Sequence, residues 1–322
     1  MGTPSPTQDS SIAGSDTAIP EHEKTTVDVN PVQSPDTEDE IEYPSKFRLL
    51  FIVLSLSLSL FIVGLDNTIL SSAIPKITDH FHALGDVGWY ASAYLLTNCS
   101  FQLMWGKLFT FYIVKWVYLV ALFIFELGSL LCAVAPTSTA LIIGRAIAGV
   151  GAGGVTNGCF LLVAHSVPPR QRPTLIGLMG SMYGFAAIAG PLLGGAFTSS
   201  AQLTWRWCFY INLPLGGFCA LVILFFVASF SGGKPTTPGF VDRLKQMDIP
   251  GTILLLPGVV CLLLALQWGG TEYAWKNGRI IALLVLAVVI LVVFGVLQYL
   301  SGDRATVPRR VFCNRNIWGS IA

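Results

Sequence analysis

The sequence predicts an all-α, polytopic membrane protein, and two observations lead to this fold class. Hydrophobic residues make up 53% of the 322-residue chain and charged residues only 11%, whereas about 25% of the residues of a soluble domain are charged. Apolar runs such as 49–65 and 280–300 are long enough to cross a hydrocarbon core of about 30 Å. Because a backbone in lipid must satisfy its own polar groups, these runs are expected to be helices.

Eight apolar spans follow one another along the chain, separated by short polar segments. We expect transmembrane helices at about 48–71, 88–109, 116–135, 139–163, 173–198, 207–230, 250–268 and 280–300.

The basic residues predict the orientation of these spans. With the N-terminus in the cytosol, only Lys76, Arg206, Lys276 and Arg279 fall in outer loops. The other Lys and Arg residues, Arg145 apart, fall in inner segments, as the positive-inside rule requires. The N-terminus is therefore expected to be cytosolic.

The segments outside the spans are polar. Residues 1–46 are rich in Ser, Thr, Pro, Asp and Glu and have no apolar period, so a disordered cytosolic tail is expected. A cytosolic loop is expected at 231–249. Residues 301–322 resemble a cytosolic segment followed by the first turn of a ninth helix, which predicts that the chain is truncated after its eighth span.

The stretch 149–154, GVGAGG, matches the G-x-G-x-x-G pattern of dinucleotide-binding proteins. That fingerprint needs a preceding strand and an acidic residue about 20 positions later. Here an apolar helical run precedes the glycines, and 166–177 contains no acid. Small residues four apart let a neighbouring helix approach closely, so we expect helix packing at Gly144, Ala148 and Ala152, and at Gly149 and Gly153.

Arg145 is the one basic residue inside a predicted span. An arginine near the bilayer centre costs about 2.5–3.5 kcal/mol on insertion scales, and such residues usually have a partner or face a wet cavity. Its position about six residues inside the span argues against snorkelling to the interface. We expect an ion-paired or functional role.

Two acidic residues are candidate partners for Arg145. Asp66 lies deep in the first span with Asn67 beside it, and Glu126 lies in the middle of the third span. A carboxyl group there must be paired, face water or keep its proton. A carboxyl that gains and loses a proton as access alternates would couple transport to protons; for Glu126, a helix-packing hydrogen bond is the alternative.

The fifth span contains many glycines and one proline. Pro191 lacks a backbone N–H, and the small residues around it permit a kink and close packing. Gly190, Pro191, Gly194 and Gly195 therefore predict a bend where two helices touch, either as a hinge or as a plain packing kink.

The cysteines and histidines do not predict a metal or a disulfide framework. Seven cysteines lie mostly in apolar stretches without paired spacing, and four histidines are scattered, so the cysteines are expected to be small core residues. No cofactor, no metal, no nucleic-acid partner and no enzymatic activity are expected.

Several motifs, which follow one another along the chain, resemble those of one family. LDNTILSSAIP in the first span, LIIGRAIAGVGAGG in the fourth and GPLLGG in the fifth, with Gly177 at its N-terminal side, resemble the major facilitator superfamily and its fungal fourteen-span drug:proton antiporter branch. Four later stretches are also typical of that branch: TWRWCFYINLPLGG, MDIPGTILLLPG, LALQWGGTEYAW and SGDRATVPRRVF.

The chain also departs from that family. Ala186 stands where the antiporter motif usually has glycine. The loop 106–119 has Thr110 in place of an expected Asp and, after it, only Lys115 of several expected basic residues, which puts the usual charge latch between spans two and eleven in doubt. The family fold has two six-helix halves, and a second half is missing here.

The resemblance implies an N-terminal six-helix transporter half at 47–230 and two linker helices at 250–300. It implies proton-coupled efflux of small apolar compounds such as toxins or drugs, from a plasma-membrane location. Asp66, Arg145 and Glu126 are the expected proton-coupling residues, and Gly177 with the four residues at 190–195 would shape the bend. The expected wall of the substrate cavity comprises Asn67, Asn98 and Gln102, for which interhelical hydrogen bonds are the alternative.

The expected partners are a small-molecule substrate, protons, the lipid bilayer and the missing C-terminal half, which transport would require. Two alternatives to efflux stay open. One is a truncated half protein that does not transport, and the other is a carrier of the same superfamily for another solute such as a sugar or siderophore.

Overall fold

The computed structural model describes residues 45–200, 203–227, 249–270 and 272–301. Within these ranges the chain is helical, with one isolated bridge between Gly269 and Tyr273. The predicted tail at 1–46, the loop at 231–249 and the segment at 301–322 lie almost wholly outside the described residues. The helices are α1 (Lys46–Phe81), the 3-10 helix η1 (Leu84–Asp86), α2 (Val87–Phe111), α3 (Val114–Val134), α4 (Ser138–Ser166), α5 (Arg172–Ser199), α6 (Trp207–Tyr210), α7 (Asn212–Phe226), α9 (Ile249–Trp268) and α10 (Gly278–Ser301).

Six helical segments of the described chain are long and apolar enough to cross a membrane. They are α1, α3, α4, α5, the pair α6–α7 taken together, and α10. Helices α2 and α9 lie where spans were expected, but they are not among the six that are long and apolar enough. The apolar part of α9 is the shorter stretch Leu254–Trp268. The predicted class, an all-α polytopic membrane protein, is confirmed.

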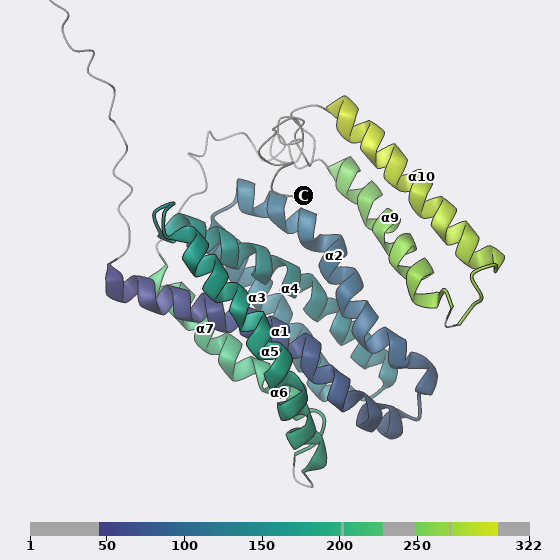
Figure 1. Ribbon diagram of the computed structural model, residues 1–322, viewed down its shortest axis with the longest axis horizontal. Helices are drawn as coiled ribbons and strands as arrows, with labels where there is room; N and C mark the ends of the chain where they lie inside the picture. Colours follow the sequence, from purple (N-terminus) through teal and green to yellow (C-terminus); the bar gives the residue numbers. More distant parts are fainter. Residues whose placement is uncertain (1–44, 201–202, 228–248, 271, 302–322) are drawn as a thin grey trace, which may run out of the picture. The chain divides into compact units, whose positions relative to one another are not determined.

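Helices α1 to α7 pack into a bundle in which α4 is the central element (Figure 1). Helix α4 contacts α3 on one side and α2 on another, and α1 lies against α5, α7 and α4. Two clusters of buried apolar side chains fill the bundle. One includes Leu56, Phe125 and Ala152, and the other includes Ile69, Leu141 and Phe209.

The glycines of α4 bring its neighbours close, as the small-residue pattern predicted. A Cβ atom at Gly144 would come within 2.9 Å of the backbone nitrogen of Cys132 on α3, and one at Gly149 would overlap the backbone of Tyr94 on α2. The stretch 149–154 lies inside one uninterrupted helix. The glycines therefore serve helix packing on two faces of α4, and the strand that a dinucleotide site needs is not there.

Helices α3 and α7 run antiparallel, and a basic residue near the N-terminal end of each binds the C-terminal end of the other. The Lys115 ammonium, in the first turn of α3, donates hydrogen bonds of 2.7 and 2.9 Å to two carbonyl oxygens at the end of α7. The Arg206 guanidinium, just before α6, donates bonds of 2.7 and 3.0 Å to two carbonyl oxygens at the end of α3. Each cation thus satisfies unpaired carbonyls and faces the negative end of a helix dipole.

The cysteines form no disulfide among the described residues. Cys132, Cys159, Cys208 and Cys219 are buried, as expected for small core residues, whereas Cys99 is exposed on α2. Cys99 differs from the expectation because no helix of the described part of the chain covers it.

Helices α9 and α10 form a hairpin that lies along α2 (Figure 1). Most of α10 is exposed, and its outward side chains are apolar; Val288 and Val292, for example, are 58% and 60% exposed. Such a surface is suited to lipid rather than to water.

Candidate functional site

The centre of the bundle holds a buried ion pair between α4 and α1. A guanidinium nitrogen of Arg145, Nη1, lies 2.5 Å from Oδ2 of Asp66, and both side chains are fully buried. Two opposite charges this close compensate each other's loss of hydration, which neither could bear alone. Of the two candidate partners for Arg145, the structure pairs it with Asp66.

Side chains and backbone of α2, with Phe209 of α6, provide the rest of the Arg145 pocket. Nε of Arg145 donates a 3.0 Å hydrogen bond to the carbonyl oxygen of Tyr90. The guanidinium carbon lies 4.3 Å from the centre of the Tyr94 ring, close enough for a cation–π contact, and 5.9 Å from that of Phe209. The remaining nitrogen, Nη2, is buried without a hydrogen-bond partner in the described part of the chain.

Asp66 is held by a second polar side chain, on α7. Nδ2 of Asn212 lies 3.1 Å from Oδ1 of Asp66 and 3.2 Å from Oγ of Ser129 on α3. Asn212 and Ser129 are fully buried. One amide therefore links the Asp66 carboxylate to α7 and α3.

Glu126 lies on α3 one turn before Ser129 and faces α7. Both of its carboxyl oxygens are buried and have no hydrogen-bond partner among the described residues. A Cβ atom at Gly216 would overlap Oε1 of Glu126, so the glycine at that position makes the room for the carboxyl group. Among the described residues, the packing hydrogen bond considered as an alternative for Glu126 is not present.

The three predicted cavity residues do not gather around the ion pair. Asn67 is exposed on α1. Gln102 lies at the edge of the α2–α4 contact, where its Nε2 is 3.5 Å from Oδ1 of Asn157 and its carbonyl accepts a 2.9 Å bond from that amide. Asn98 is also on the side of α2 that faces α4, beside Gly153. For Gln102 the interhelical hydrogen bond that was the alternative is present.

The glycine-rich motif of α5 lies on α1 for part of its length. Cβ atoms at Gly190 and Gly194 would come within 3.0 and 2.8 Å of backbone atoms of Ile69. Helix α5 continues through Pro191 as one helix, and the carbonyl of that proline accepts a 3.3 Å bond from Ser72. Two other members, Gly177 and Gly195, meet nothing within 4 Å.

The threonine before Ile69 adds a direct polar contact in the same place. Oγ1 of Thr68 lies 2.9 Å from the carbonyl oxygen of Ala186. Because Thr68 is two residues after Asp66, the α1–α5 contact and the ion pair share one short piece of α1.

Sequence reasoning missed the partners that complete the pocket: Tyr90, Tyr94, Ser129 and Asn212. Asn212 stands in an apolar span, in the stretch YINLPLGG, and the argument that singled out Asp66 applies to a buried amide too. The Tyr90 contact uses a backbone carbonyl, which carries no sequence signal.

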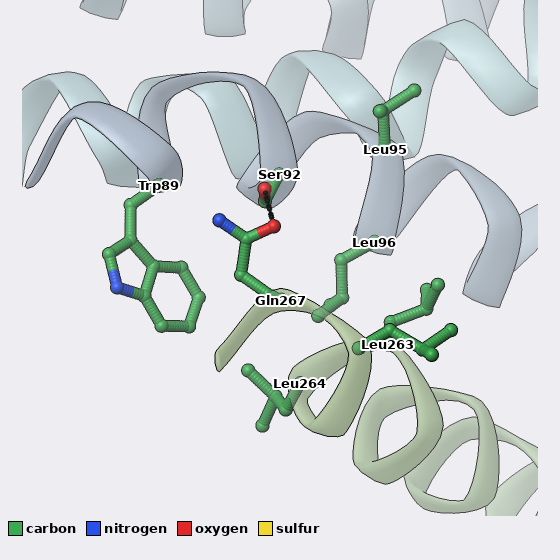
Figure 2. A pocket seen from close by; sticks show the side chains of 8 residues that line it. Trp89, Ser92, Leu95, Leu96, Leu263, Leu264 and Gln267 are labelled. Carbon is green, nitrogen blue, oxygen red and sulfur yellow. Dashed lines mark hydrogen bonds between the residues drawn. The ribbon is translucent and has the colours of Figure 1, made fainter. Parts of the chain in front are cut away.

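A groove of about 180 Å³ lies elsewhere, between α2 and α9 (Figure 2). Its walls are mainly leucines and Trp89, and at its mouth Oγ of Ser92 donates a 2.6 Å hydrogen bond to Oε1 of Gln267. It holds no part of the ion pair.

The fold is thus that of a polytopic membrane protein with a buried arginine–aspartate pair at the centre of its helix bundle. The family model of the Major Facilitator Superfamily matches residues 56–314, and the chain belongs to that superfamily. This confirms the family that the motifs of spans one, four and five resemble.

Similar proteins are fungal transporters. The chain is 58% identical over 273 residues to the efflux pump aflT of Aspergillus parasiticus, covering 85% of this chain and 53% of that protein. It is 52% identical over 285 residues to the MFS-type transporter astH of Aspergillus oryzae (88% and 50% covered). It is also 52% identical over 280 residues to the rubrofusarin-specific efflux pump aurT of Gibberella zeae (87% and 51% covered). The chain spans about half the length of the curated relatives it matches.

Proposed function

We propose that this chain is the proton-coupling half of an efflux antiporter for small, largely apolar compounds. The observation that carries the proposal is the fully buried Arg145–Asp66 pair, which joins α4 to α1 and receives further hydrogen bonds from α2 and α7. The relatives named as efflux pumps support the direction of transport. Residues 47–230 would form the six-helix half, and 250–300 the two linker helices.

The coupling would work through the charge on Asp66. While Asp66 is ionised, it neutralises Arg145 and holds Asn212 through its second oxygen. A proton on Asp66 removes that neutralisation and leaves a cation in a region without water, which is costly. The helices would then favour the arrangement in which Arg145 finds other acceptors, so that proton uptake changes the bundle.

The contact between α1 and α5 would transmit a movement of α1 to the rest of the transporter. Thr68 and Ile69, which touch Ala186 and Gly190 of α5, follow Asp66 by less than one turn. A shift of this part of α1 would therefore be passed to α5. Transport itself would need the remainder that the relatives contain, because alternating access works between two halves.

The test uses a chimera in which this chain is followed by the part of aflT that it does not cover. Vesicles that contain the chimera should export a substrate of that pump when a proton gradient is applied. Replacement of Arg145 by alanine should reduce gradient-driven export to background while the protein remains inserted in the membrane. The control is Lys46→Met, at an exposed lysine at the start of α1, which should export normally.

Two other outcomes would reject parts of the proposal. Export by Arg145→Ala at the rate of the unchanged chimera would show that the pair does not couple transport to protons. Export of equal rate with and without the gradient would identify a facilitative carrier instead.

The membrane location and orientation are part of the same proposal. The distribution of basic residues favours a cytosolic N-terminus, and we propose the plasma membrane as the site of action. A fluorescent protein fused to the N-terminus should stay protected from protease added to intact cells and mark the cell periphery.

A further inference from the structure

Four buried polar atoms, on three side chains near the ion pair, have no hydrogen-bond partner in the described part of the chain. They are the two carboxyl oxygens of Glu126, Nη2 of Arg145 and Oδ1 of Asn212. One is a hydrogen-bond donor on a cation, and the others are acceptors. Buried polar groups are rarely left unpaired, so a set of complementary unpaired groups in one region indicates a second arrangement in which they are used.

The position of Glu126 connects it with the ion pair through two adjacent turns. Glu126 and Ser129 are three residues apart on α3 and therefore on the same face. Asn212 and Gly216 are likewise four residues apart on α7. Since Asn212 bonds Ser129 and Gly216 touches the Glu126 carboxyl, the carboxyl lies one turn from the amide that holds Asp66.

The charges around Glu126 give its carboxylate form no support. From α1 it faces Asp66, which is already paired with Arg145, and from α7 it faces the thiol of Cys219. The lysine on its own helix, Lys115, lies eleven residues away and is bound to carbonyls at the end of α7. A buried carboxylate without a cation or a donor is strongly disfavoured relative to the neutral acid.

We propose that Glu126 is a second proton-holding carboxyl of this site, which exchanges the role of counter-ion with Asp66. While Asp66 is ionised and paired with Arg145, Glu126 keeps its proton. When Asp66 takes up a proton, Glu126 releases one and its carboxylate accepts from the guanidinium, whose Nη2 is available. One carboxyl is neutral and one ionised in each state, so the buried charge stays balanced. This exchange deepens the proposed proton coupling and rests on it for its role in transport.

Infrared spectroscopy of the whole chain in lipid vesicles tests the exchange directly, because a protonated carboxyl has its own C=O band. At neutral pH the chain should show such a band, and labelling of glutamate with carbon-13 should shift it. Glu126→Gln should remove the band. The matched control Glu272→Gln, at an exposed glutamate between α9 and α10, should leave it unchanged.

A second variant tests the exchange itself. In Asp66→Asn the arginine loses its first counter-ion, so Glu126 should ionise and the glutamate band should disappear at neutral pH. Absence of a glutamate-sensitive band from the unchanged chain, or its survival in Glu126→Gln, would refute a proton on Glu126. Survival of the band in Asp66→Asn would refute the exchange.

These spectra are independent of transport. A chimera that fails to export by proton exchange would reject the proposed function even if the band behaves as expected. A pump with normal coupling and no glutamate band would reject the role of Glu126 alone.

Discussion

At the scale of single residues, Arg145 organises the polar contacts at the centre of the bundle, where it binds side chains or backbone of α1 and α2. The sequence predicted that Arg145 would be paired, because an arginine inside a span needs compensation and only Asp66 and Glu126 were available. It did not decide between them, since both lie inside predicted spans, away from the span ends. The choice depends on which helices touch, and α1 brings Asp66 to Arg145 while Glu126 is turned toward α7.

The stability of the chain should reflect this pairing. Arg145→Gln leaves the carboxylate without its cation and should lower the free energy of unfolding by about 3–5 kcal/mol, the usual cost of breaking a buried pair. Asp66→Asn should cost less, because Glu126 can replace the lost charge. The double variant Asp66→Asn/Arg145→Gln should be more stable than Arg145→Gln alone, because it leaves no unpaired carboxylate at position 66.

Thermal unfolding of the purified chains in detergent measures these differences. Additive losses, with the double variant less stable than both single variants, would show that the two side chains do not depend on each other.

At the scale of helices, close packing and capping hold α3, α4 and α7 together. The sequence predicted the close packing, because small residues recur every four positions in α4. It did not predict that Lys115 caps α7, because that contact joins residues more than a hundred positions apart. From the sequence, Lys115 is only the one basic residue that follows Thr110 in the loop 106–119, where the family has several.

A glycine that contacts a neighbouring helix should tolerate alanine less than a free one does. At Gly151 a Cβ atom would overlap the backbone of Phe125, whereas at Gly184 it would meet nothing within 4 Å. We expect Gly151→Ala to destabilise the chain by about 1–3 kcal/mol through overpacking.

Gly184→Ala serves as the control and should be neutral or slightly stabilising, since alanine is the better helix former. Equal melting temperatures for the two variants would contradict the close approach of α3 and α4.

Lys115→Met should destabilise the end of α7. The change removes two hydrogen bonds from an ammonium group, and bonds to charged groups contribute about 1.5–3 kcal/mol each. Hydrogen exchange at the last turn of α7, followed by mass spectrometry, should become faster. Lys46→Met, at an exposed lysine on α1, should leave that exchange unchanged; an equal effect of both variants would show that the cap is not specific.

At the scale of the whole molecule, the hairpin of α9 and α10 is attached to the first half through α2. Ser92 bonds Gln267, and the Trp89 and Trp268 rings meet edge to face with their centres 6.1 Å apart. The sequence predicted two spans at these positions but not their docking on α2, because that contact rests on a few side chains with no periodic signal.

The docking predicts a cross-link in the membrane. With cysteines at positions 92 and 267 in a chain freed of its own cysteines, a short thiol-specific cross-linker should join them efficiently. Chains with either cysteine alone should give no internal cross-link. Failure of the double variant to react, with both thiols accessible to a small label, would show that the hairpin does not rest on α2.

In the proposed function, the Arg145–Asp66 pair couples proton movement to export. Vesicles containing the chimera with aflT, loaded with a pH-sensitive dye, measure this most directly. Addition of substrate to the unchanged chimera should start a proton flux opposite to the substrate, and Asp66→Asn should abolish that flux while substrate still binds. A substrate-driven proton flux of normal size in Asp66→Asn would contradict the claim.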